Sequence, residues 1–108
     1  MALLDAVIEN RALAAARTLA RLGTVRAVYV FGSLVEGSAD RWSDIDVAAF
    51  MEGIENWDIL QRARAMALVM EEAGSAVEAH LYPVSALVNP GQGSFAEYIL
   101  RHGVRITI

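Results

Sequence analysis

Two short segments of the chain alternate apolar and polar side chains with a period of two, the pattern of a β-strand with one buried face. In residues 44–51 (DIDVAAFM), the odd-numbered positions are all apolar, whereas Asp44 and Asp46 lie on the opposite face. In residues 77–82 (VEAHLY), Glu78 likewise lies opposite the apolar positions. The pattern therefore predicts a sheet with one apolar face, which helices cover, and one face that presents acids.

The rest of the chain supplies the helices and a further strand. Residues 3–22 and 56–73 are rich in helix formers, and each stretch is followed by a glycine that ends it. Residues 25–31 (VRAVYVF) predict another buried strand, and residues 95–102 predict a last short helix that leads into a terminal strand, VRITI. This order predicts an α+β (α/β-like) fold, a small mixed β-sheet with helices packed on one face.

Length and composition limit the classes of protein to which the chain can belong. A length of 108 residues fits one domain, spanning residues 1–108, and 56% hydrophobic content with 20% charged residues excludes a disordered chain. The absence of cysteine excludes disulfides and thiolate metal sites. The net charge of −4 argues against a long nucleic acid as substrate, because proteins that bind one present a basic surface. No apolar run approaches the roughly 20 residues that span a membrane, so we expect no membrane association and a cytoplasmic location.

The acids of the two alternating segments suggest a metal site. If the two strands are neighbours, Glu78 lies within about 5 Å of an aspartate directly opposite. Carboxylates gathered in this way repel each other and need a compensating cation. Oxygen ligands suit Mg²⁺ or Mn²⁺ rather than zinc, and side chains two positions apart, as in Asp44 and Asp46, can share one or two ions. Two ions can activate an attacking oxygen and stabilise a leaving pyrophosphate.

A second group of residues is suited to holding phosphate. Gly32 and Ser33 directly follow the predicted strand 25–31, where a glycine lets the backbone approach a ligand and a hydroxyl can donate to phosphate oxygens. Arg41 and Ser43 stand beside the acids and can contact phosphate, although an exposed loop pair is an equal alternative.

Three further groups of polar residues have two interpretations each. His80 shares the face of Glu78 and can line the site, but an ordinary surface histidine is the preferred interpretation. The arginines of the first helix are expected to form a solvated face, with a partner-binding groove as the alternative; they are Arg11, Arg17 and Arg21. Trp42 and Trp57 are expected to be packing residues rather than platforms for a base.

The segment FGSLVEGSADRWSDIDVAAF places ten residues between Ser33 and Asp44, which gives the pattern G-S-x10-D-x-D. This pattern resembles the signature of the DNA polymerase β-type nucleotidyltransferase superfamily. Its spacing resembles that of the minimal nucleotidyltransferases, small proteins often paired with a HEPN-domain partner. The segment VEAHLYP resembles the third-carboxylate strand of that family, with Glu78 where aspartate is usual, and FAEYILRHGVRI resembles its last helix and strand.

The resemblance implies the polymerase β-type nucleotidyltransferase fold and a set of residue roles. Two Mg²⁺ ions, or Mn²⁺ in their place, would be the cofactors. The catalytic and metal-binding residues would be Asp44, Asp46 and Glu78, with Glu78 also helping to activate the acceptor hydroxyl. Gly32 and Ser33 would bind the nucleotide triphosphate, and Ser43 is included as a further nucleotide-binding candidate.

The function implied is transfer of a nucleoside monophosphate, AMP from ATP, to a hydroxyl acceptor. By resemblance, that acceptor is a tyrosine of a HEPN-type toxin, which would make this chain the antitoxin. Since so short a chain lacks the extra domain that larger members use, we expect a homodimer or a hetero-oligomer to complete the site. The alternatives are a non-catalytic antitoxin that masks its partner and a plain metal-binding protein. The last is disfavoured because residues 40–51 lack the central glycine of a calcium loop and have Ile45 there.

Overall fold

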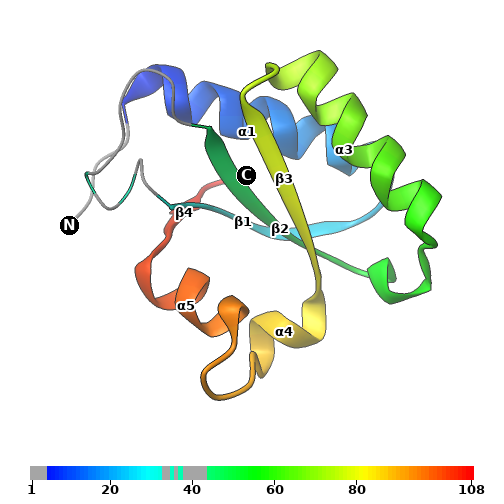
Figure 1. Cartoon of the computed structure of the whole chain (residues 1–108), viewed down its shortest axis with the longest axis vertical. Coiled ribbons are helices and arrows are strands. Elements are labelled where there is room, and N and C mark those ends of the chain that lie inside the picture. Colours follow the sequence, from blue (N-terminus) through cyan, green and yellow to red (C-terminus); the bar gives the residue numbers. More distant parts are fainter. Residues whose placement is uncertain (1–4, 33–34, 36, 38–43) are drawn as a thin grey trace.

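A four-stranded mixed sheet organises the chain in the computed structural model, which describes residues 5–32, 35, 37 and 44–108 (Figure 1). The elements along the chain are α1 (Ala6–Ala20), β1 (Val25–Phe31), β2 (Ile45–Met51), the 3-10 turn η1 (Ile54–Asn56), α3 (Ile59–Ala73), β3 (Val77–Pro83), α4 (Val84–Val88), α5 (Phe95–His102) and β4 (Val104–Ile106). The strand order is β3-β2-β1-β4. β1 is antiparallel to both β2 and β4, whereas β2 and β3 are parallel. The predicted α+β class with a mixed sheet is therefore confirmed.

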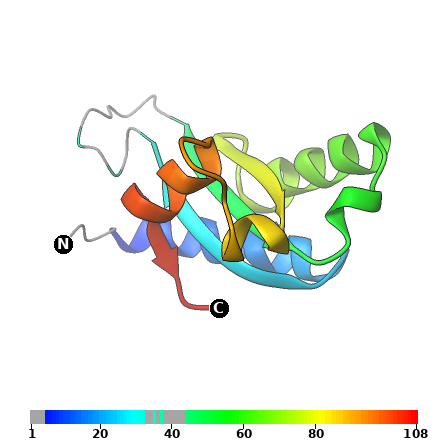
Figure 2. The same ribbon diagram turned by 90° about the horizontal axis from the view of Figure 1, so that it is seen from below.

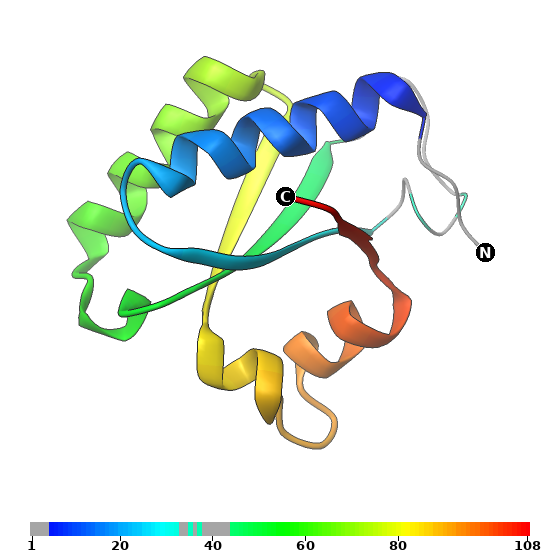
Figure 3. The same cartoon turned by 180° about the vertical axis from the view of Figure 1, so that it is seen from behind.

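One face of the sheet is covered by α1 and α3, which lie side by side (Figures 1 and 3). The apolar positions of β2 predicted to face helices do so and belong to the main core: Ile45, Val47, Ala49 and Met51. Val77 and Ala79 of β3 join them, so both strands keep the expected alternation. The pattern of period two thus correctly assigned the faces of these two strands.

Polar contacts bring the two long helices together along their sides. The Arg11 guanidinium donates to the carbonyl of Ala73 at 3.4 Å, and Arg21 binds both carboxylate oxygens of Glu72. Glu72 also accepts from the hydroxyl of the buried Thr18 at 2.7 Å. The arginines of α1 are exposed, as expected, and Arg11 and Arg21 also link α1 to α3.

The helix ends follow local capping chemistry. Asp5 accepts from the first amides of α1, and α3 begins with a capping box in which Asp58 and Gln61 satisfy each other's backbone N–H groups. The sequence predicted that second helix from residue 56, but η1 occupies residues 54–56, and so α3 starts later. In the described part of the chain, we find no helix whose length and apolar character would let it cross a membrane.

The opposite face of the sheet is also partly covered, which corrects the prediction that helices pack on one face only. α4 and α5 lie on this side (Figures 1 and 2), and a smaller core forms beneath them from Ala27, Phe31, Ala48, Phe50 and Ile99. The physical reason is that the positions of β2 beyond Asp46 on this face are Ala48 and Phe50, which are apolar and need cover. The end of this face that carries Asp46 keeps polar side chains, since Glu78 and His80 of β3 lie beside it.

Candidate metal and nucleotide site

The parallel pairing of β2 with β3 determines which side chains meet at the polar end of the sheet. Asp46 is in register with Glu78, and Ala48 is in register with His80. The antiparallel pairing of β1 with β2 places Phe31, the last residue of β1, opposite Asp46. Gly32 follows directly. Two strand starts and one strand end therefore converge on Asp46.

Asp46, Glu78 and His80 form a compact group of three potential ligands. One ligand atom from each lies within 4.8 Å of the other two. His80 Nε2 is 3.3 Å from Asp46 Oδ1 and 3.8 Å from Glu78 Oε1. The side chains of Asp46 and His80 are 25% and 28% exposed, and that of Glu78 is 50% exposed. The group is thus anchored in the sheet but open to a ligand from solvent.

The backbone at Gly32 comes close to this group. Its φ of +86° lies in the left-handed region, which residues with a Cβ rarely adopt. A Cβ built on it would lie 2.6 Å from Asp46 Oδ2. Both the backbone conformation and the space therefore require glycine, and the chain turns out of β1 in contact range of the carboxylate.

Aromatic rings support the polar group from the side of α5. Phe31 packs edge-on to the His80 ring, with ring centres 5.0 Å apart, and to Phe95 at 5.5 Å. Tyr82, two residues beyond His80 on the same face, stacks on Phe50 at 5.4 Å. Burial raises the pKa of the Tyr82 hydroxyl, so this group stays neutral at ordinary pH. The Phe31 ring restricts how far the His80 side chain can move away from the carboxylates.

The structure brings together some of the predicted site residues and not others. Asp46 and Glu78 are adjacent, as the alternation suggested, and Gly32 lies beside them. Asp44 is exposed, lies one residue before β2 and is outside the group of three. Ser33 and Ser43 lie outside the described residues, as does Arg41.

For His80 the sequence interpretation preferred an ordinary surface histidine, and the structure places its ring nitrogen close to both carboxylates. Its place two residues after Glu78, on the same face of one strand, was the available signal. Two carboxylates and an imidazole form a donor set that fits a divalent cation, because the cation offsets the repulsion between the two acids.

Comparison with known proteins agrees with the fold. The sequence model of a protein family described as "Polymerase beta, Nucleotidyltransferase" matches residues 15–107. The chain belongs to this family. No curated protein matches the sequence of this nucleotidyltransferase-family chain.

A solved structure is similar along nearly the whole chain. It is that of a Sulfolobus solfataricus protein provisionally named a nucleotidyltransferase, with a TM-score of 0.56 and 18% sequence identity. The similarity covers 97% of this nucleotidyltransferase-family chain and 89% of the other. At that identity, the likeness concerns the fold. It agrees with the family assignment, and members of this family usually work with divalent metal ions.

Proposed function

We propose that this protein transfers a nucleoside monophosphate, AMP from ATP, to the hydroxyl group of an acceptor. The observation that carries the proposal is the placement of Asp46 beside Glu78 on two parallel strands, next to the Gly32 turn. Family membership supplies the class of reaction. The convergence of acids at an open end of the sheet supports this end as its location.

The chain's own residues divide into two roles. Asp46 and Glu78, with Asp44 just before β2, would hold the divalent ions, Mg²⁺ or Mn²⁺. When bound, such ions offset the negative charge that develops on the phosphate oxygens. The Gly32 turn, with the Ser33 and Ser43 hydroxyls, would bind the triphosphate.

The transfer itself exchanges one phosphorus–oxygen bond for another. The acceptor hydroxyl oxygen forms a bond to the α-phosphorus of ATP, while the bond from that phosphorus to the bridging oxygen of pyrophosphate breaks. Pyrophosphate leaves with the electron pair of that bond. The hydroxyl proton passes to a carboxylate oxygen of Glu78, whose half-exposed side chain is accessible to an acceptor from solvent.

The proposed acceptor is a tyrosine of a HEPN-type toxin, for which this chain would be the antitoxin. The site is shallow, because Glu78 is half exposed and Asp44 is exposed. A shallow site leaves the base and the acceptor to be held by another chain, either the acceptor protein or a second copy. We therefore propose a hetero-oligomer or a homodimer as the active form.

The test uses ATP labelled on different phosphates and measures which label reaches the acceptor protein. The protein would be incubated with Mg²⁺, the product of the adjacent reading frame and ATP labelled at the α- or the γ-phosphate. We expect α-label on the acceptor protein and γ-label in pyrophosphate. The Asp44→Ala, Asp46→Ala double variant should transfer no label, whereas Glu55→Gln, an exposed carboxylate beyond the other end of β2, should transfer as the wild type does. Label transfer that persists in the double variant would show that the site is elsewhere.

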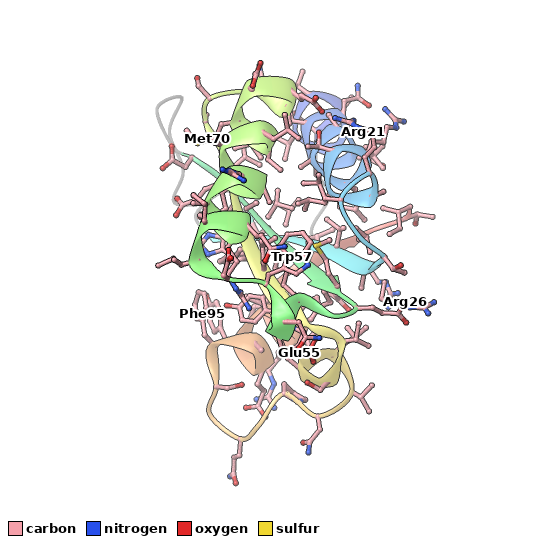
Figure 4. All side chains as sticks on the ribbon, turned by 90° about the vertical axis from the view of Figure 1, so that its right-hand side faces the viewer. Arg21, Arg26, Glu55, Trp57, Met70 and Phe95 are labelled. Atoms are coloured by element: carbon pink, nitrogen blue, oxygen red, sulfur yellow. The ribbon has the colours of Figure 1, made fainter. Side chains whose placement is uncertain are left out.

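A second function, masking of a partner without catalysis, is favoured by one observation. α3 exposes Ile59 (86%), Met66 (37%) and Met70 (45%), whose spacing places them on one side of the helix. Figure 4 labels Met70 on this helix. Masking would be favoured if the double variant neutralises the toxin as well as the wild type does and neither protein transfers label.

A further inference from the structure

His80 differs from the other members of the polar group because it offers a nitrogen. Its Nε2 atom faces both carboxylates, at 3.3 Å from Asp46 Oδ1 and 3.8 Å from Glu78 Oε1. It is carried by the same strand as Glu78, two positions further along and on the same face. The three donor atoms therefore surround one point in space.

The surroundings hold the imidazole in this orientation. The edge-on packing of Phe31 against the ring, at 5.0 Å, limits movement on one side. The residue in register with His80 on β2 is Ala48, whose single methyl group leaves the ring free to lean toward Asp46. With 28% of the side chain exposed, the histidine is largely fixed by the sheet rather than free in solvent.

The spacing of the donor atoms suits direct coordination. Ligand atoms at right angles around an ion with bonds of about 2.1 Å lie about 3 Å apart. The two separations that involve His80 Nε2 are 3.3 and 3.8 Å, so a small closing movement of side chains would bring them to that value. Coordination requires the tautomer with its proton on Nδ1, so that the Nε2 lone pair faces the ion.

We propose that His80 Nε2 is a direct ligand of the ion held by Asp46 and Glu78, and that this nitrogen makes the site prefer first-row transition-metal ions to Mg²⁺. The inference rests on the proposed function only in requiring that Asp46 and Glu78 bind a divalent ion. Mg²⁺ favours oxygen ligands and keeps its water, whereas imidazole is a good ligand for transition-metal ions. Mn²⁺ accepts both oxygen and nitrogen donors, and its unpaired electrons make it a suitable probe.

A structural role for His80 predicts a different result. In that case, Nε2–H donates to Asp46 Oδ1 and only orients the carboxylate. Substitution of His80 would then weaken the binding of Mn²⁺ and of Mg²⁺ to the same extent, and no nitrogen would be bonded to the ion. The two roles are therefore separable by measurements that do not depend on activity.

The experiment uses the full chain with Mn²⁺ and pulsed electron paramagnetic resonance, which detects nitrogen bonded to the ion. The chain has two histidines, so His102→Gln is a matched control for His80→Gln. We expect nitrogen coupling in the wild type and in His102→Gln, and its loss in His80→Gln. Calorimetric titrations should show that the ratio of Mn²⁺ to Mg²⁺ affinity falls several-fold in His80→Gln and stays unchanged in His102→Gln.

The outcomes separate this inference from the proposed function. Two results would overturn the role of His80 and leave the proposed function intact. One is Mn²⁺ binding that needs Asp46 and Glu78 but shows no nitrogen coupling. The other is a ratio of Mn²⁺ to Mg²⁺ affinity that His80→Gln leaves unchanged. Mn²⁺ binding that survives Asp46→Asn and Glu78→Gln would instead overturn the proposed site. If His80→Gln fails to fold, ¹⁵N-labelled histidine in the His102→Gln protein decides the question, because the coupling must then change to that of the heavier isotope.

Discussion

The charge of Asp46 should destabilise the protein without a metal ion and stabilise it with one. An oxygen of Asp46 lies within 4.8 Å of one of Glu78. Two unit charges at that separation repel by about 3.5 kcal/mol at an effective dielectric constant of about 20, and by about 0.9 kcal/mol in water. Because the two side chains are 25% and 50% exposed, we expect a value near the lower limit, about 1 kcal/mol.

The perturbation is Asp46→Asn, which removes the charge, keeps the shape and leaves an oxygen that can still accept from His80. Thermal unfolding at about pH 8 with a chelator should show the variant melting higher than the wild type by about 4–6 °C, the shift that about 1 kcal/mol gives a domain of this size. Mn²⁺ at about ten times its Kd should stabilise only the wild type, by about 1.4 kcal/mol. The order of the two melting temperatures should therefore reverse when Mn²⁺ is added.

Glu55→Gln provides the control for this experiment, since it removes an equally negative but exposed charge beyond the other end of β2. We expect its stability to stay within about 0.5 kcal/mol of the wild type, with the full response to Mn²⁺. The reasoning is refuted if Asp46→Asn melts lower than the wild type in chelator, or if Mn²⁺ stabilises both proteins equally.

Three further substitutions test other parts of the structure. Gly32→Ala should cost roughly 1–2 kcal/mol of stability, because Gly32 has a left-handed backbone conformation. It should also weaken Mn²⁺ binding, because the added Cβ would lie 2.6 Å from Asp46 Oδ2 and push the carboxylate aside. Urea unfolding checks the first effect and Mn²⁺ titration the second, which an unchanged Mn²⁺ affinity would contradict. Hydrogen bonds from Arg21, and to a smaller extent from Thr18, lower the pKa of Glu72. The ionised carboxylate therefore stabilises the fold at pH values above the ordinary pKa of 4.5, and this stabilisation is lost as the pH falls through the lowered pKa. Urea unfolding from about pH 6 to 3 should show a smaller loss of stability in Glu72→Gln than in the wild type, and parallel plots of stability against pH would contradict this. Leu19→Ala in the main core should lose about 2–5 kcal/mol in urea unfolding while Mn²⁺ affinity stays the same, because Leu19 lies under the face covered by α1 and α3.

The sequence by itself determined which side chains of β2 and β3 share a face with the apolar positions that α1 and α3 cover, and where most elements lie. Side chains alternate along any strand, so Val47 and Ala49 had to share a face and Asp46 had to take the other. The capping groups of α1 and α3 are likewise local, since each cap bonds to residues two or three positions away. The spacing of Gly32 from the acids is a property of the sequence too, because it depends on the order of residues alone.

Only the tertiary structure decided which side chains meet. Thirty-two positions separate Asp46 from Glu78, and the parallel pairing of β2 with β3 that sets them side by side is a non-local contact whose register no short segment encodes. The same pairing turned His80 from an ordinary surface residue into a neighbour of two carboxylates. It was also tertiary packing that placed α4 and α5 over Phe50, since apolar residues on the second face are buried by whatever elements the chain can bring back to them.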